Sequence, residues 1–177
     1  MATLDHESTP SKAAIGGHPL HPFLVPFPIA FLVGALVTDL VNRATGTAFW
    51  AQASYYLVVA GFITGVLAAL AGFIDFVSRP QIRRLSIAWM HFLGNGAAML
   101  LTLVNILLRT RDPVAPVSGA ELGLSLLVTL IFLVTGWLGG EKVFRHRVGV
   151  TPDARDHGRA LEERERRHAA GIRGARR

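Results

Sequence analysis

Apolar residues gather in four long runs along the chain, separated by short segments rich in charge, glycine or proline. The runs extend over residues 23–41, 52–77, 85–108 and 122–138. A helix that crosses the hydrocarbon core of a bilayer needs about 20 predominantly apolar residues. A segment in lipid must also satisfy its own backbone hydrogen bonds, which a helix does and an open strand does not. The pattern therefore predicts four membrane-spanning helices.

The segments between the runs are short and carry turn-forming or charged residues. Gly46 follows the first run, Pro80 follows the second, and an Arg-Asp-Pro sequence follows the third. Short connections place successive helices antiparallel and next to each other. We therefore expect an all-α fold, an integral membrane up-and-down four-helix bundle over residues 15–150. A flexible segment, residues 1–14, precedes it, and a basic cytoplasmic tail, residues 151–177, follows it.

Basic residues are distributed unequally between the two ends of the predicted bundle. One end carries Lys12, Arg79, Arg83, Arg84, Lys142, Arg145 and Arg147, whereas the other carries only Arg43, Arg109 and Arg111. Short cytoplasmic loops of membrane proteins are enriched in lysine and arginine. This bias predicts that both termini lie on the cytoplasmic side. No cleavable signal peptide is evident before the first run.

Composition narrows the classes of function. Charged residues make up 17% of the 177 residues, and there are no cysteines, whereas a soluble domain carries about 25% charged residues. Without cysteine, the chain has no disulfide, thiolate metal site, iron–sulfur ligand or cysteine nucleophile. No Gly-x-Ser-x-Gly turn or phosphate-binding glycine loop occurs. A hydrolase or transferase is therefore not expected, whereas a redox role stays open.

Small and polar residues recur at helical spacing on three of the runs. Helices in lipid associate through such residues rather than through the hydrophobic effect. Spacings of three and four place the members of each set on one helix face. We assign these faces to the bundle interior: Gly61, Gly65, Ala68, Gly72 and Asp75; His91, Asn95, Ala98, Thr102 and Asn105; and Ser125, Thr129, Phe132, Gly136 and Gly139.

Ionisable residues at membrane depth are costly and indicate a functional site. The candidate site residues lie toward the cytoplasmic half of the predicted bundle: His18, His21, Asp75, His91 and His146. We expect Asp75 to accept an imidazole N–H of His91, which would strengthen the other ring nitrogen as a ligand. In the outer half we expect Asp39 to pair with Arg43 at i+4 and to do nothing more.

Prolines interrupt the start of the first helix. Pro26 and Pro28 follow the sequence His-Pro-Leu-His-Pro at residues 18–22. Either the regular helix begins near Pro26 or its inner end is kinked, because proline is tolerated in a first turn and breaks an interior one. His18 and His21 would share a face if this stretch is helical.

The spaced motifs resemble a known family. They are residues 17–22, 27–29, 71–75, His91 with Asn95, 136–141 and 145–150. Together they resemble a bacterial membrane family catalogued as domain of unknown function 2231, over about residues 15–150. Arg147 departs from the family pattern, in which a small residue follows the histidine, and this leaves the role of His146 open. The resemblance implies a four-helix domain of the bacterial inner membrane. Relatives joined to Rieske-type or cytochrome-type domains suggest electron transfer with a redox partner protein.

Three interpretations of the histidines follow. In the first, two histidines from different helices bind a b-type haem axially. His21 and His91 would be the ligands, with His18 or His146 as substitutes, and Gly72, Gly94 and Gly96 would make room for the macrocycle. In the second, His18, His21, Asp75 and His91 hold a divalent metal or relay protons. In the third, the same residues form a polar contact that fixes helix packing in a structural or accessory protein.

The C-terminal tail is rich in arginine and lacks aromatic residues among the arginines. Single-stranded nucleic acid is usually bound with the help of aromatic stacking. We therefore expect the tail to lie on anionic lipid and expect no nucleic-acid partner. The sequence leaves open whether bundles associate into oligomers.

Overall fold

The computed structural model describes residues 11–146, together with residues 162 and 166. In chain order its elements are β1 (Ala14–Ile15), β2 (His18–Pro19), α1 (Leu20–Leu24), α2 (Pro26–Thr45), α3 (Ala48–Ser78), α4 (Pro80–Arg83), α5 (Ser86–Arg109) and α6 (Gly119–His146). Most of the predicted N-terminal segment and nearly all of the predicted tail fall outside the described residues.

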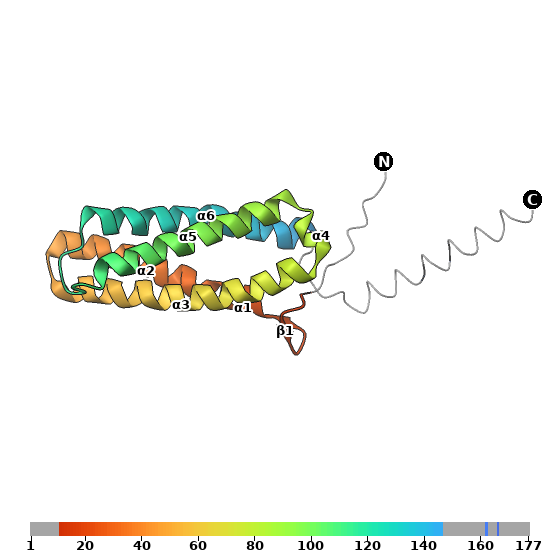
Figure 1. Ribbon diagram of the computed structural model, residues 1–177, viewed down its shortest axis with the longest axis horizontal. Coiled ribbons are helices and arrows are strands. Elements are labelled where there is room, and N and C mark those ends of the chain that lie inside the picture. Colours follow the sequence, from red (N-terminus) through yellow and green to blue (C-terminus); the bar gives the residue numbers. More distant parts are fainter. Residues whose placement is uncertain (1–10, 147–161, 163–165, 167–177) are drawn as a thin grey trace, which may run out of the picture.

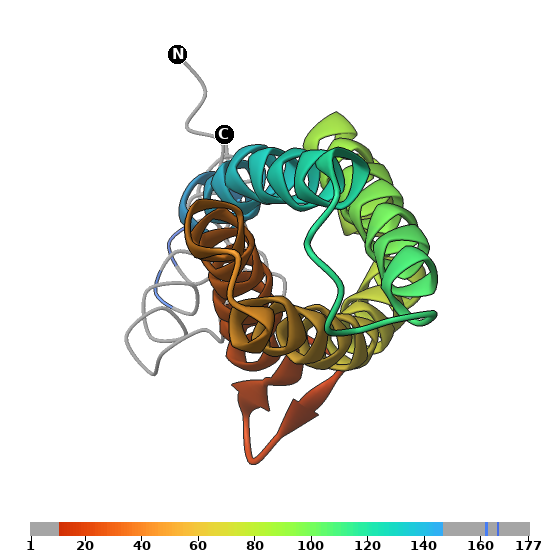
Figure 2. The same ribbon diagram turned by 90° about the vertical axis from the view of Figure 1, so that its left-hand side faces the viewer.

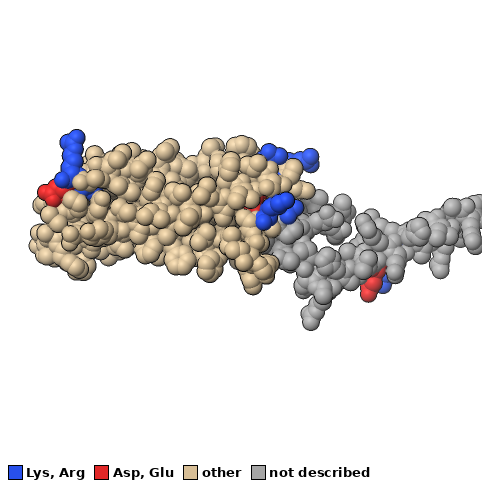
Figure 3. Space-filling view, turned by 60° about the horizontal axis from the view of Figure 1, so that its bottom comes forward, with Lys and Arg blue, Asp and Glu red and all other residues tan. Residues whose placement is uncertain are grey.

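Four segments are long and apolar enough to cross a membrane: Leu20–Thr45, Ala48–Ser78, Ser86–Arg109 and Gly119–Glu141. They run up and down beside one another (Figure 1) and enclose a common interior when seen from one end (Figure 2). Charged side chains gather at the two ends and leave the flank in view without charge (Figure 3). The predicted all-α bundle of four spans is therefore confirmed.

An apolar cluster fills the middle of the bundle. Its buried members come from all four spans: Leu32, Ala35, Val58, Ala98, Val128 and Phe132. The glycines of α3 allow close packing here, since a Cβ on Gly61 would lie 2.6 Å from Leu32 Cγ. Dispersion contacts within this cluster connect all four spans.

The interior faces agree with the sequence pattern except near the end of α6. Gly61, Gly65 and Ala68 of α3, and Ala98, Thr102 and Asn105 of α5, are buried as predicted. In α6, however, Thr135 is buried and Gly136 is exposed. The buried positions of this part of α6 are Ser125, Val128, Thr129, Phe132 and Thr135, so the first three predicted residues of this face, Ser125, Thr129 and Phe132, are confirmed.

The first span is divided at Val25 into a short helix and a long one. The regular helix α2 begins at Pro26, and the short helix α1 precedes it across Val25. Val25 keeps a right-handed helical conformation, and its N–H donates to the His21 carbonyl oxygen at 3.1 Å. The first span is therefore interrupted rather than shortened, and His21 stays on a helical turn.

A small hairpin stands before α1 at the same end of the bundle as α4 (Figure 1). Strands β1 and β2 pair antiparallel, with Ile15 opposite His18. Gly16 and Gly17 connect the strands with φ angles of 57° and 83°. Two successive positive φ angles suit a tight hairpin turn, and glycine adopts them without steric cost. His18 therefore lies on a strand and shares no helical face with His21, contrary to the helical alternative.

Candidate functional site

His21 of α1 and His91 of α5 lie next to each other at the end of the bundle that carries the hairpin. Their ring centroids are 6.0 Å apart, and the ring planes are nearly perpendicular, at 81°. Both side chains are partly buried. The two histidines that the sequence singled out as a pair are thus brought together from separate spans.

Each ring is held by a hydrogen bond to the backbone of another helix. His21 Nδ1 lies 2.8 Å from the Ala68 carbonyl oxygen of α3. His91 Nδ1 lies 2.8 Å from the Thr135 carbonyl oxygen of α6. A carbonyl oxygen can only accept, so Nδ1 of each ring carries the proton and Nε2 carries the lone pair in the neutral form. Four helices therefore take part in orienting two imidazoles.

Glycines make space for both rings. A Cβ on Gly72 would lie 2.7 Å from His21 Nδ1, and a Cβ on Gly139 would lie 3.2 Å from His91 Cε1. Gly94 of α5 allows close approach of α6, because a Cβ on Gly94 would lie 2.6 Å from Thr135 Cγ2. Gly72 and Gly94, expected to make room for a macrocycle, are instead filled by these side chains. Gly96 has no atom within 4 Å of its Cβ position.

Asp75 does not orient His91 as expected; its hydrogen bonds go to the segment before the hairpin. Oδ2 accepts from Ser11 Oγ at 2.6 Å, and Oδ1 accepts from the backbone N–H groups of Lys12 and Ala13 at 2.6 and 3.0 Å. The Leu20 N–H in turn donates to the Ala13 carbonyl oxygen at 2.8 Å. Asp75 therefore anchors the chain that leads into α1, and so supports His21 indirectly.

The remaining candidates do not join the pair in the described part of the chain. His18 is exposed on β2, and α6 ends at His146, whose side chain lies outside the described residues. Among the described residues, no three His, Cys, Asp or Glu side chains form a group that could hold a metal ion. Of the expected cluster, the described side chains bring together His21 and His91.

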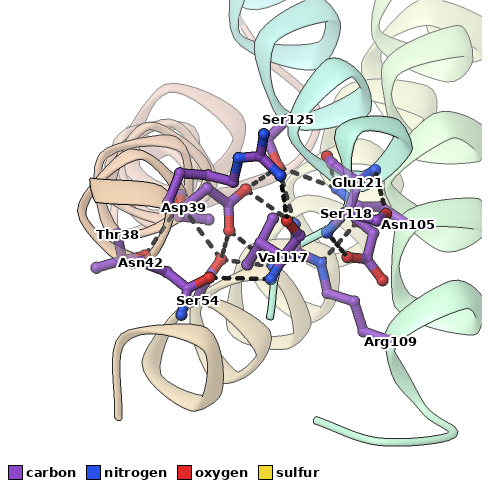
Figure 4. A network of polar contacts seen from close by, with 12 residues as sticks. Thr38, Asp39, Asn42, Ser54, Asn105, Arg109, Val117, Ser118, Glu121 and Ser125 are labelled. Carbon is purple, nitrogen blue, oxygen red and sulfur yellow. Dashed lines mark hydrogen bonds and ion pairs between the residues drawn. The ribbon is translucent and has the colours of Figure 1, made fainter. Parts of the chain in front are cut away.

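The opposite end of the bundle contains a buried ion pair that the sequence pattern did not predict (Figure 4). Arg109 of α5 binds Asp39 of α2 through two hydrogen bonds, Nη1 to Oδ1 and Nη2 to Oδ2, both 2.8 Å. The exposed fraction is 0% for the Asp39 side chain and 4% for that of Arg109. The expected pairing of Asp39 with Arg43 is wrong, since Arg43 is exposed and donates to the Val117 carbonyl oxygen at 3.3 Å.

Polar side chains from the other helices complete this network. Ser54 of α3 and Ser125 of α6 donate to Asp39 at 2.5 and 2.6 Å, and Arg109 Nε donates to Asn105 Oδ1 at 2.7 Å. All four spans thus contribute to one buried cluster in which the charges are paired and hydrogen-bonded. The loop before α6 covers it, with Val117 buried and its N–H donating to Asn42 Oδ1 at 2.9 Å.

One signal in the sequence pointed to this network. Arg109 continues the interior face of α5 by one further step of four from Asn105, and Ser125 was already assigned to the interior of α6. The predicted third span ended at residue 108, which placed Arg109 in the loop. Extending the interior face by one turn would have brought Arg109 into the bundle.

Comparison with known proteins agrees with the architecture. Residues 17–152 match the family model described as predicted membrane protein (DUF2231). No curated protein and no solved structure gives a significant match to the chain. The matched region covers strand β2 of the hairpin and all four spans, so the chain belongs to the DUF2231 family of predicted membrane proteins.

Proposed function

We propose that the protein binds a b-type haem and transfers electrons, with His21 and His91 as the axial ligands. One observation carries the proposal: two imidazoles from different spans adjoin, and each Nδ1–H is bound to a backbone carbonyl of a third or fourth helix. Metal-binding histidines commonly donate their second ring N–H in this way, which sets the tautomer and raises ligand basicity.

The spacing of the rings is compatible with a shared metal. Histidine nitrogens bind transition metals at about 2.0–2.1 Å, which places the centroids of two rings on opposite sides of one ion roughly 6 Å apart. The observed separation is 6.0 Å. The Nε2 lone pair of each ring would bind the metal, while Nδ1–H keeps its hydrogen bond to the backbone carbonyl.

Haem suits the donor set better than a bare metal ion. The porphyrin supplies four ligands, so the protein need supply only two, whereas tetrahedral zinc sites use three or four protein ligands. The described residues offer two adjoining histidines and no third His, Cys, Asp or Glu in one group. Two histidines would fill both axial positions, which favours electron transfer over binding of a substrate at iron.

A structural role is the second candidate, and it is favoured by the same hydrogen bonds. Imidazoles that bind backbone carbonyls and pack on glycine also fix the relative position of helices. A path for protons across the membrane has less support. The apolar layer of Leu32, Val58, Ala98, Val128 and Phe132 lies between the histidines and the Asp39–Arg109 pair.

The positions of the basic residues support an orientation with the hairpin end in the cytoplasm. The structure removes Arg109 from the loops of the other end, because its charge is paired inside the bundle. Arg43 and Arg111 remain exposed there, against Lys12, Arg83 and Arg84 at the hairpin end. We infer a bacterial inner-membrane protein with both termini inside. Reporter fusions at the two termini and in the loop of residues 110–118 test this orientation.

Haem content of purified variants tests the function. The protein is expressed with added haem precursor, and haem is quantified per polypeptide for wild type, His21→Ala, His91→Ala and His18→Ala. We expect both ligand variants to lose bound haem and His18→Ala, changed at an exposed histidine on β2, to retain it. Equal haem content in all four proteins would remove the pair from the site.

A further inference from the structure

Three arginines gather where the chain turns from α3 into α5. Arg79 follows α3, Arg83 ends α4, and Arg84 follows α4. Ile82 of α4 is buried against Phe76 and Ala88, which leaves Arg83 and Arg84 exposed. Figure 3 shows basic side chains at this end of the bundle, beside a flank that carries no charge in this view.

These arginines have no acidic partner among the described residues. Among the described residues, the ion pair joins Asp39 and Arg109, which lie at the other end of the bundle. Asp75, close in sequence, accepts hydrogen bonds from residues 11–13 instead. Arg79 Nε is buried and has no hydrogen-bond partner in the described structure. Guanidinium groups present a planar fork of donors that matches phosphate oxygens.

An aromatic surface continues directly from the arginines along the spans. Phe73, Trp89 and Phe92 are 49%, 44% and 36% exposed. Phe76 connects them, since its ring stacks on Phe92 at 4.9 Å and meets Trp89 edge-on at 4.8 Å. Trp89 Nε1 donates to the Arg83 carbonyl oxygen at 2.9 Å, which ties the aromatic surface to α4. Tryptophan with an apolar body and a polar tip is typical of the membrane interface.

We propose that this surface, formed by Arg79, Arg83, Arg84, Phe73, Trp89 and Phe92, binds one anionic phospholipid. The phosphate lies against the arginines, and an acyl chain lies along the three aromatic rings. Lipid fits better than a soluble phosphate because the aromatic part lies on membrane-spanning helices, where hydrocarbon covers it. The site is independent of the proposed haem.

Trp89 provides a reporter for this site. The full-length protein, with Trp50→Phe and Trp137→Phe, is placed in vesicles of equal parts phosphatidylglycerol and phosphatidylcholine. In separate samples one of the two lipids carries bromine on its acyl chains. Comparison of the quenching of Trp89 fluorescence by each brominated lipid gives the relative affinity of the site for the two lipids. Arg79→Gln, Arg83→Gln and Arg84→Gln test the site. Arg111→Gln, an exposed arginine at the opposite end, is the matched control.

We expect phosphatidylglycerol to be preferred over phosphatidylcholine. Each of the three substitutions should lower this preference about fivefold, because a basic residue near a membrane surface contributes about 1 kcal/mol to the binding of anionic lipid. Arg111→Gln should leave it unchanged, and added inorganic phosphate should not displace the lipid. Arg83 is exposed, so its variant remains informative if Arg79→Gln does not fold. Equal quenching by both lipids would overturn the proposal. So would an equal effect of Arg111→Gln, or loss of the preference in inorganic phosphate at constant ionic strength.

Discussion

Replacing Arg109 by leucine removes the cation that binds Asp39 within the described part of the chain. The carboxylate loses two hydrogen bonds of 2.8 Å and keeps only the hydroxyl groups of Ser54 and Ser125. Its exposed fraction is 0%, so water cannot replace the guanidinium without opening the bundle. The variant therefore leaves an uncompensated charge among four helices.

The magnitude follows from the cost of a buried unpaired charge. Removing one partner of a buried ion pair destabilises a protein by about 3–5 kcal/mol. This corresponds to a change of roughly 100- to 4,000-fold in the unfolding equilibrium, at about 1.4 kcal/mol per factor of ten. The double variant Asp39→Leu with Arg109→Leu should be destabilised by about 1–3 kcal/mol less than the sum of the single variants, because the two charges interact directly.

The assay is reversible unfolding of the purified protein in mixed micelles with increasing denaturing detergent, followed by helical circular dichroism. Arg43→Leu is the matched control, since Arg43 is exposed and makes one long hydrogen bond, of 3.3 Å, to Val117. It should cost less than about 1 kcal/mol. The reasoning is refuted if Arg109→Leu costs no more than Arg43→Leu, or if the two single variants are additive.

Two further substitutions probe the other end of the bundle. Gly72→Ala places a Cβ 2.7 Å from His21 Nδ1 and should lower the free energy of unfolding by about 1–3 kcal/mol through overpacking. Gly96→Ala, whose Cβ would lie in open space, should be nearly neutral in the same unfolding assay. Equal costs for the two variants would contradict the close packing of His21 on Gly72. Asp75→Ala releases three hydrogen bonds to residues 11–13, so limited proteolysis should cut before α1 at least several-fold faster than in wild type. Unchanged cleavage would show that Asp75 does not hold this segment.

The spans could be predicted because lipid imposes a length and an apolar composition that few other structures share. The interior faces of α3 and α5 followed from spacing alone. The interior face near the end of α6 did not, because steps of three and of four both keep a residue near the same helix face. From Phe132, a step of three reaches the buried Thr135, whereas the predicted step of four reaches the exposed Gly136.

Contacts between distant residues were harder to predict than faces. Asp39 and Arg109 are 70 positions apart, and local spacing favoured Arg43 because i,i+4 pairs can be recognised without knowing which helices pack together. Asp75 was expected to accept a hydrogen bond from His91, yet its carboxylate accepts hydrogen bonds from the backbone N–H groups of residues 12 and 13. The His21–His91 pair could be predicted because each residue lies near the start of a span, and the first and third spans of an up-and-down bundle begin at the same end.

The measurement that tests the central claim most directly is the visible spectrum of the detergent-purified wild-type protein, oxidised and then reduced with dithionite. Our account predicts a Soret band that shifts on reduction, with sharp α and β bands characteristic of haem iron held by two histidines. A protein that stays colourless after expression with haem precursor and after incubation with haemin would contradict it. In that case the hydrogen bonds of His21 and His91 to Ala68 and Thr135 would be assigned to helix packing alone.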